Sequence, residues 1–424
     1  MYGSARQSAL DCLDRVQNGA LRVCLGAFRT SPIASLHVEA GELPLTLRRQ
    51  QLSLQYIIKL RSTPSNPAFR CVFNSNFKLL FEARQQIIPT LGLRLHQDIQ
   101  NCGINVNMSI VLRNIQTHQL LLKAPVFLLT LHLLGSKSEI PLAVFIARFS
   151  ELLSTYDGYT RIFTAESKDG QAVGAAAVIG PRVCVKRLPD HSSIFSAEAR
   201  AILLGLDMVQ QCTGDRFVFL SDSLSCLQSL QSRDLTHPLI AEILCRVHEF
   251  VIRGFSIVFI WVPSHVGLAG NTAADAAAKA ALNLPVTNLA IPYSDYNYLI
   301  RTHTLNQWQE LWNSETQNKL FAVEPTVNIV KSYRLPRRDE IIIHRLRIGH
   351  TYLTHGHLLK KECAPECSSC HVQLTVEHIL LSCGTLKVIH DKYFCVTSLS
   401  ELFNRVSPHS VLSFIKELGF YCKI

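Results

Sequence analysis

Residues 255–275, FSIVFIWVPSHVGLAGNTAAD, constrain the fold of this chain more than any other stretch. The run from Phe255 to Val262 is apolar and rich in β-branched and aromatic residues, which predicts a buried strand. A short loop with His265 follows, and an alanine-rich helix from Asn271 carries Asp275. An imidazole and a carboxylate therefore lie beyond the carboxyl end of a strand, where open α/β sheets place their sites.

The surrounding residues, 155–283, predict a mixed five-stranded sheet flanked by helices. Alternating apolar runs bounded by Gly, Pro and Asp indicate strands, and apolar positions at helical spacing indicate helices. The expected order is β-β-β-α-β-α-α-β-α. The strands are expected at 159–165, 172–180, 182–188, 216–223 and 255–262, and the first helix at 193–212.

Four residues from separate elements of this region could carry chemistry: Glu198, Asp222, His265 and Asp275. Two-metal phosphoryl hydrolysis needs several carboxylates around ions roughly 3.5–4 Å apart. Carboxylate oxygens are also the ligands that Mg²⁺ prefers, and a nearby histidine can carry protons. Each residue taken singly has a structural interpretation, such as a dipole contact for Glu198 or a helix cap for Asp222. Their joint order favours a shared site.

Composition narrows the class of protein. The net charge of +10 and the pI near 9.0 favour an anionic partner, of which nucleic acid is the usual one. The 14 cysteines follow no secretory signal, which predicts a reduced, intracellular protein of the nucleus or cytoplasm. The most apolar stretch, 124–135, is too short to span a bilayer, so we expect no membrane partner. The oligomeric state is left open.

A cysteine-rich segment at 363–383, CAPECSSCHVQLTVEHILLSC, predicts a small zinc module within a helical C-terminal region, 290–424. Its spacing is C-x2-C-x7-H-x4-C, and two pairs of ligands at such spacings can complete a tetrahedral zinc site. Cys363 could replace the first cysteine, and His371 is a weaker alternative ligand; unliganded thiols are the structural alternative. The expected ligands are Cys367, Cys370, His378 and Cys383.

The flanks of the central region are expected to be mainly helical. At the N-terminal side, apolar periodicity predicts one helix that ends near Gly26 and a second that follows Pro44. Residues 61–150 have no clear repeat and are expected to be an irregular connector. At the C-terminal side, a helix is expected at 294–320, with Trp308 and Trp312 on its buried, apolar side. The basic residues of 331–347, here called the basic cluster, could contact phosphate or form a solvated face.

Three motifs of the central region resemble a type 1 ribonuclease H domain: SAEARAI around Glu198, FLSDSLS around Asp222, and WVPSHVGLAGNTAAD with Asp275. More narrowly, the chain is similar to the C-terminal part of a non-LTR (LINE-type) retrotransposon polyprotein. GALRVCLGAFRTSP and LTLRRQQLSLQYIIKL resemble the segment after the reverse transcriptase thumb, so 1–150 would be a helical connector. RLRIGHTYLTHGHLL resembles the segment after the ribonuclease H domain of such polyproteins, where the Cys/His spacing also recurs.

The resemblance implies a substrate and a set of roles. Such domains cleave the RNA strand of an RNA–DNA hybrid with two Mg²⁺ (or Mn²⁺) ions held by four acidic residues. By position, Glu198, Asp222 and Asp275 would be metal ligands, and His265 would handle protons.

One position departs from the family. Its first strand ends in Thr-Asp-Gly-Ser, whereas this chain has Thr164-Ala165-Glu166-Ser167. Because strand side chains alternate between faces, Glu166 is expected to point away from the site unless a bulge redirects it. Glu166 is therefore a doubtful fourth ligand. Two hypotheses stay open: a nuclease with a rearranged strand end, and an inactive transposon remnant that only binds nucleic acid.

Overall fold

The computed structural model describes residues 5–73, 78–83, 90–105, 125–131, 141–264, 267–329 and 333–424. They form two compact units, one made of Met1–Ser53 with Arg301–Ile424 and the other of Leu54–Ile300. This grouping differs from the three consecutive segments suggested by the sequence. The reason is that the first helices of the chain pack against a helix from its C-terminal third.

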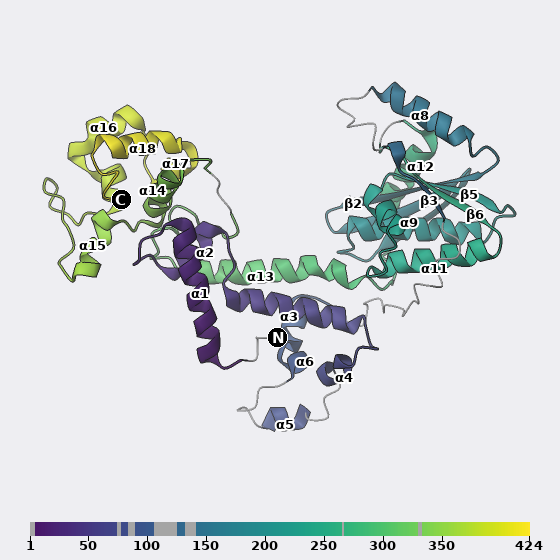
Figure 1. The fold of residues 1–424 in the computed structure, drawn as a ribbon, viewed down its shortest axis with the longest axis horizontal. Coiled ribbons are helices and arrows are strands. Elements are labelled where there is room, and N and C mark those ends of the chain that lie inside the picture. The colour runs from purple at the N-terminus through teal and green to yellow at the C-terminus, as the bar shows by residue number, and fades with distance from the viewer. Residues whose placement is uncertain are drawn as a thin grey trace. The chain divides into compact units, whose positions relative to one another are not determined.

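A six-stranded sheet forms the centre of the 54–300 unit (Figure 1). The strand order is β1-β6-β5-β2-β3-β4, with β2, β3 and β4 antiparallel and β1, β6, β5 and β2 parallel. The strands are β1 (Val126–Leu128), β2 (Thr160–Asp169), β3 (Ala172–Ile179), β4 (Arg182–Leu188), β5 (Arg216–Ser221) and β6 (Ser256–Trp261). The predicted mixed α/β, ribonuclease H-like sheet is confirmed. The sixth strand, β1, lies in the expected connector, because three residues are too few to show a period of two.

Helices cover both faces of the sheet. On one face, α9 (Ile194–Val209), α10 (Leu224–Gln231) and α11 (Pro238–Ile252) share the largest apolar cluster with Phe217, Phe219 and Phe259. On the other face, α12 (Ala269–Ala281) covers β2 and β3. Helix α8 (Leu142–Ser154) packs there on Val218 and Val258 of β5 and β6. Alternate residues of each strand therefore belong to different cores.

Helix α12 packs unusually close to the sheet. A Cβ atom added at Gly174 of β3 would lie 2.4 Å from the carbonyl oxygen of Ala278. The small side chains Ala165, Ala176 and Ala274 fill the same layer. Alanine on the helix and glycine on the strand thus permit the backbone approach that brings Asp275 to the sheet.

The remaining helices of this unit are short. They are α4 (Ala68–Phe73), α5 (Lys78–Ala83), α6 (Leu91–Arg94) and α7 (His96–Asn101). Ile99 of α7 and Cys102 join a separate small core with Leu54, Ile57 and Ile300.

The second unit is helical. Its main helices are α1 (Gln7–Leu25), α2 (Ile33–Ala40), the start of α3 (Leu45–Arg61), the greater part of α13 (Tyr296–Asn313), α14 (Arg337–Ile348), α15 (Tyr352–Lys360), α16 (Lys387–Tyr393), α17 (Leu399–Arg405) and α18 (Pro408–Glu417). As expected, Gly26 ends α1 in the left-handed conformation, with φ of 59°. Trp308 and Trp312 lie in the core with Val38 and Leu47, as predicted.

Two arginines of the basic cluster, Arg345 and Arg347, have internal partners in this unit. Arg347 is 1% exposed and pairs with Glu39 at 2.9 Å and Glu324 at 3.4 Å. Arg345 donates to the backbone oxygens of Gly26 and Ile424. Both guanidinium groups therefore hold the unit together, and a phosphate role does not fit them.

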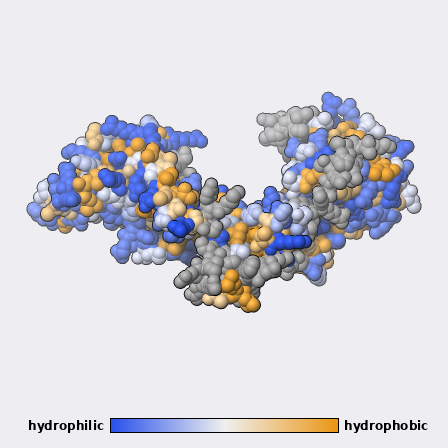
Figure 2. Space-filling view, turned by 60° about the horizontal axis from the view of Figure 1, so that its bottom comes forward, coloured by the Kyte–Doolittle hydropathy of each residue, from blue (hydrophilic) through white to orange (hydrophobic). Residues whose placement is uncertain are grey.

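In the part of the chain that the structure describes, every helix is too short or too polar to cross a membrane. The face drawn in Figure 2 mixes hydrophilic and hydrophobic residues on both units.

Candidate functional site

The acidic residues come from four different elements of the sheet unit. Glu198 is the fifth residue of α9, beyond the first turn, and Ser193 caps this helix by accepting from Ser196 N at 3.1 Å. Asp222 directly follows β5, and Ser223 takes the cap position of α10. Asp275 is the seventh residue of α12. The dipole and capping interpretations of Glu198 and Asp222 therefore do not apply.

Glu166 lies on the face of the sheet that carries α9. Strand β2 pairs residue for residue with β3, so Ala165 faces Ala176 and Glu166 faces Ala175. Ala176 belongs to the core under α12 and Ala175 to the core under α9. Glu166 therefore lies on the same face as the helix that carries Glu198, and β2 pairs with β3 here without a bulge. Strand β2 pairs with β5 up to Thr164, which faces Ser221. The later residues of β2 therefore extend beyond the end of β5, the end at which Asp222 follows.

The charges of the four carboxylates influence one another. Burial raises the pKa of Glu198 well above its usual value, and the charges of Asp222, Glu166 and Asp275 raise it further. Burial likewise raises the pKa of Glu166, again with help from Asp222 and Asp275, while Lys168 opposes the shift. Carboxylates that disfavour each other's charge are candidates for a cation site.

Two of these carboxylates have buried oxygens that lack a donor. Among the described residues, Oε2 of Glu166 and Oε2 of Glu198 are buried without a hydrogen-bond partner, as is Oδ1 of Asn271, one turn before Asp275. Buried polar atoms are normally paired, so such oxygens are suited to a metal ion. A set of oxygen ligands fits Mg²⁺ or Mn²⁺ by its chemistry. His265, the expected proton carrier, lies outside the described residues.

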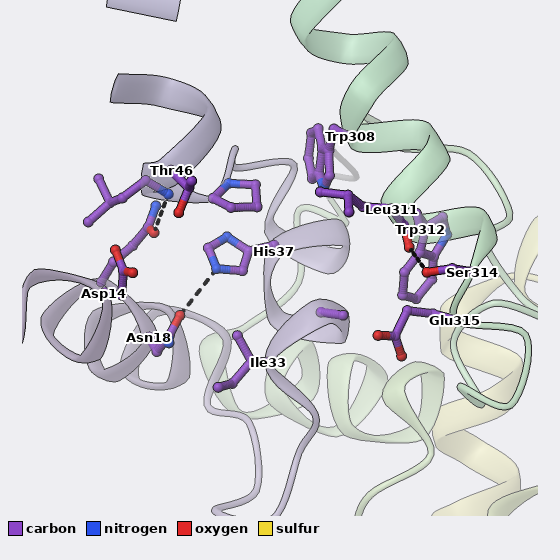
Figure 3. A pocket seen from close by; sticks show the side chains of 14 residues that line it. Asp14, Asn18, Ile33, His37, Thr46, Trp308, Leu311, Trp312, Ser314 and Glu315 are labelled. Atoms are coloured by element: carbon purple, nitrogen blue, oxygen red, sulfur yellow. Dashed lines mark hydrogen bonds between the residues drawn. The ribbon is translucent and has the colours of Figure 1, made fainter. Parts of the chain in front are cut away.

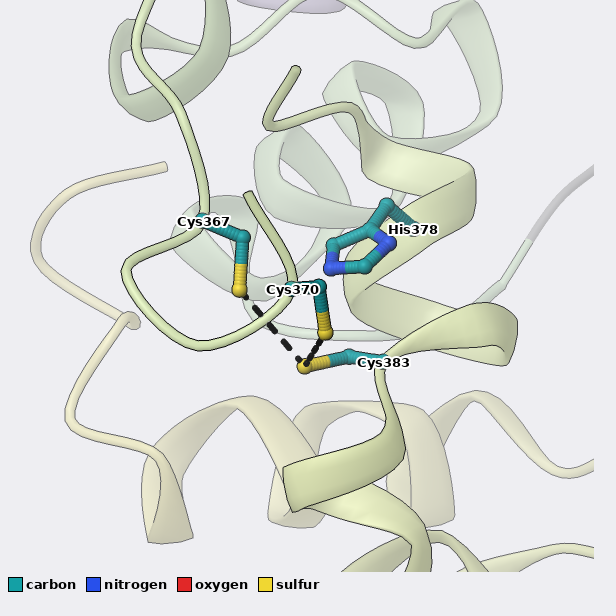
Figure 4. A group of neighbouring side chains, drawn as sticks. All are labelled: Cys367, Cys370, His378 and Cys383. Atoms are coloured by element: carbon teal, nitrogen blue, oxygen red, sulfur yellow. Dashed lines mark hydrogen bonds between the residues drawn. The ribbon is translucent and has the colours of Figure 1, made fainter. Parts of the chain in front are cut away.

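The Cys/His cluster is a second assembled group, in the helical unit (Figure 4). The ligand atoms of Cys367, Cys370, His378 and Cys383 all lie within 4.8 Å of one another. Cys383 Sγ lies 3.9 Å from both other sulfurs. A tetrahedron with Zn–S bonds of about 2.3 Å has edges of roughly 3.8 Å, so this cluster could hold a zinc ion.

The local backbone explains how residues five apart reach one centre. Residues His378–Ser382 form a single π-helical turn, and Cys383 N donates to His378 O at 2.9 Å. This i to i+5 bond brings Cys383 onto the side of His378. Nε2 of His378 is buried without a partner. Cys363 and His371, the alternatives left open by the sequence, are exposed and lie outside the group.

Hydrogen bonds favour the thiolate form of Cys367, the first residue of the cluster. Those from the Cys370 backbone and then from the His378 side chain lower the pKa of Cys367 to about 6. The thiolate is the form that binds metal.

The comparisons with known proteins concern the sheet unit. Residues 162–281 match the family described as "Reverse transcriptase-like". Strand order and this match together mark 162–281 as a ribonuclease H-like domain. No curated protein matches the chain.

Similar solved structures include three ribonucleases H. Ribonuclease H1 from the halophilic archaeon Halobacterium salinarum NRC-1 is 24% identical, with a TM-score of 0.25, over 30% of this chain and 98% of that one. The N-terminal RNase H domain of Rv2228c from Mycobacterium tuberculosis, fused to maltose-binding protein, is 20% identical, with a TM-score of 0.25, over 29% and 94%. LC11-RNase H1, isolated from compost by a metagenomic approach, is 18% identical, with a TM-score of 0.25, over 30% and 96%.

Asp295 is a site-supporting residue that the sequence did not indicate. It lies beyond the matched residues, is 4% exposed, and accepts from Ser193 N at 3.1 Å and from the hydroxyls of Ser193 and Ser196 at 2.9 Å. Arg200 of α9 also donates to Ala290 O at 3.0 Å. The segment after the ribonuclease H-like domain thus anchors the helix that carries Glu198. An aspartate 97 positions from Glu198 shows no local signal of this contact.

The raised pKa of Glu198 predicts a pH-dependent stability. Its folded pKa exceeds the unfolded value of about 4.3, so the folded state binds more protons and loses stability as pH rises through the folded pKa. We expect Glu198→Gln to melt about 2–4 °C above wild type at pH 7.5, the change that ~1 kcal/mol produces in a domain of this size. The difference should vanish at pH 4, and Mg²⁺ should raise the melting temperature of wild type more than that of the variant. Thermal melts at both pH values check this, with Glu249→Gln on the exposed side of α11 as control; an equal difference at both values would contradict it.

The helical unit also contains a pocket of about 420 Å³ between α1, α2 and α13 (Figure 3). Its histidine, His37, uses both ring nitrogens internally, with Glu42 O at 2.9 Å and Asn18 Oδ1 at 3.1 Å. Trp308 and Trp312 line it but are buried, so neither ring offers a face for a base to stack on.

Proposed function

We propose that the ribonuclease H-like domain hydrolyses the RNA strand of RNA–DNA hybrids, with Glu166, Glu198, Asp222 and Asp275 as the ligands of divalent metal ions. The observation that supports the proposal is the mutual electrostatic influence of these four carboxylates, two of which have buried oxygens without a hydrogen-bond partner. Glu166 supplies the fourth carboxylate that Ala165 does not.

In this proposal the metal ions, the acidic side chains and the net charge have separate roles. Bound metal ions would activate water and stabilise the leaving oxygen. The protein holds the four acidic groups on a rigid sheet and two helices, and burial keeps bulk water from Glu198. The net charge of +10 supports nucleic acid as the partner. We also propose the origin in a non-LTR retrotransposon, which rests on the resemblance of the flanking motifs.

The alternative is a remnant that binds nucleic acid without cutting it. The observation in its favour is Ala165, which stands where the resembled family has its first aspartate and which is 1% exposed under α12.

An assay in Mg²⁺ with an RNA–DNA hybrid whose RNA strand is labelled distinguishes the active nuclease from the remnant that only binds. We expect wild type to cut the hybrid and to leave the matching DNA duplex intact. Ala165→Asp should not raise the rate, because this side chain faces the alanine layer under α12 while Glu166 faces the cluster. Hybrid binding and circular dichroism show whether each protein is folded. An inactive wild type, together with activity gained in Ala165→Asp, would establish the remnant.

A further inference from the structure

Three basic side chains from separate segments meet at the start of α15 in the helical unit. Nζ of Lys319 lies 2.9 Å from Nε2 of His355. The ring of His350 stacks on the ring of His355, with centroids 3.8 Å apart and planes 18° apart. The sequence motif that contains both histidines, RLRIGHTYLTHGHLL, has no part in the proposed hydrolysis.

The surrounding residues hold this arrangement in place. Oγ1 of Thr30 bonds Nδ1 of His350 at 3.2 Å, and Oγ1 of Thr354 bonds Nδ1 of His355 at 2.7 Å. Gly349 turns the chain between α14 and α15 with φ of 77°, and a Cβ there would lie 2.8 Å from Cδ of Lys319. The lysine stem therefore lies against Gly349, and the cluster is built by the fold.

The charges in this cluster oppose one another. Burial and then His350, Lys319 and His357 lower the pKa of His355 to about 3. Burial and then Lys319 lower the pKa of His350 to about 4. All the side chains behind these shifts are basic. Within the described ranges, no ion pair between these three residues and a carboxylate is found.

Some donors of the cluster are left for a ligand. Nε2 of His355 accepts from Lys319, which leaves the ammonium group two further N–H donors. His350 uses Nδ1 with Thr30, so its Nε2 is the ring nitrogen left over. Lys319 is exposed and His350 half-buried, so solvent reaches both. The N-terminus of α15, which Thr351 caps, adds a favourable field for an anion.

We propose that Lys319, His350 and His355 form a binding site for a phosphate group. A phosphate oxygen would accept from the two free N–H groups of Lys319 and from Nε2 of His350, while His355 holds the ammonium group in place. The phosphate could come from a nucleic-acid backbone or from a free phosphate compound, and the chemistry of recognition is the same. This site lies in the helical unit and does not depend on the acidic cluster.

Binding of inorganic phosphate to the full-length protein tests the site. We expect saturable shifts of the His350 and His355 ring signals in NMR spectra. Besides these two rings, the titratable groups of the cluster are Lys319 and His357. Lys319→Gln and His350→Gln should weaken phosphate binding at least tenfold. Lys416→Gln, which removes the same charge from exposed α18, should bind as wild type does.

A second arm identifies the source of the phosphate. A 20-nucleotide single-stranded RNA that loses affinity in Lys319→Gln, but not in Lys416→Gln, indicates the nucleic-acid backbone; loss of inorganic phosphate binding alone indicates a free phosphate compound. Absence of saturable shifts in wild type, or wild-type phosphate binding by a folded Lys319→Gln protein, would overturn the site. Hybrid hydrolysis at the acidic cluster is measured separately, so failure of either proposal can be told from failure of the other.

Discussion

We expect Glu166→Gln to lower Mg²⁺-dependent hybrid cleavage by roughly three orders of magnitude or more, the scale expected when one member of a catalytic unit is lost. The neutral amide keeps the shape of the side chain but removes a negative charge that raises the pKa of Glu198. Asp222→Asn should have a comparable effect, because Asp222 is the carboxylate with the largest influence on both Glu166 and Glu198. Single-turnover rates on a labelled hybrid measure the loss.

Asp169→Asn is the matched control for this prediction. Asp169 lies on the same strand as Glu166, three residues further on, and is exposed. We expect it to cut as wild type does. Melting temperatures show whether Glu166→Gln is folded. We expect it to be at least as stable as wild type, because the substitution removes a charge from a cluster of like charges. Equal rates for Glu166→Gln and wild type would exclude Glu166 as a ligand.

Removing zinc should unfold the segment around the Cys/His cluster. We expect one zinc ion per chain in the purified protein, and we expect chelation or Cys383→Ser to release it. Zinc supplies about 10–16 kcal/mol of folding free energy in small zinc modules, so its loss exceeds what such a segment can tolerate. Val376, Ile379 and Leu380 share a core with α14, α17 and α18, so the damage should spread to these helices. Metal analysis and hydrogen exchange across 365–415 measure both effects.

Cys363→Ser is the control for the zinc prediction. Cys363 lies four residues before the first ligand and is exposed. This variant should keep both the metal and the exchange protection. A protein that contains no zinc, or that loses it equally on Cys363→Ser, would contradict the assignment of Cys367.

Local sequence was sufficient for features that depend on neighbouring residues. The strand and helix order of residues 160–281 follows from periodicity, and Gly26 marks a helix end because glycine adopts positive φ without strain. The Cys/His ligands could be predicted because they lie within 17 residues, where spacing limits which atoms can meet. Pairing of distant charges was different. From the sequence, Arg347 is interpreted as a surface charge. In the structure it is buried and pairs with Glu39, 308 positions away.

By itself the sequence determined the type of sheet, the acidic residues available and the spacing of the Cys/His cluster, since each depends on residue type and short-range order. Tertiary structure alone decided which face of β2 carries Glu166, that Asp295 anchors α9, and that two histidines and a lysine meet at the start of α15. These depend on which strands and helices pack together, because a side chain's partners across a sheet or between helices are set by register and not by its neighbours in the chain.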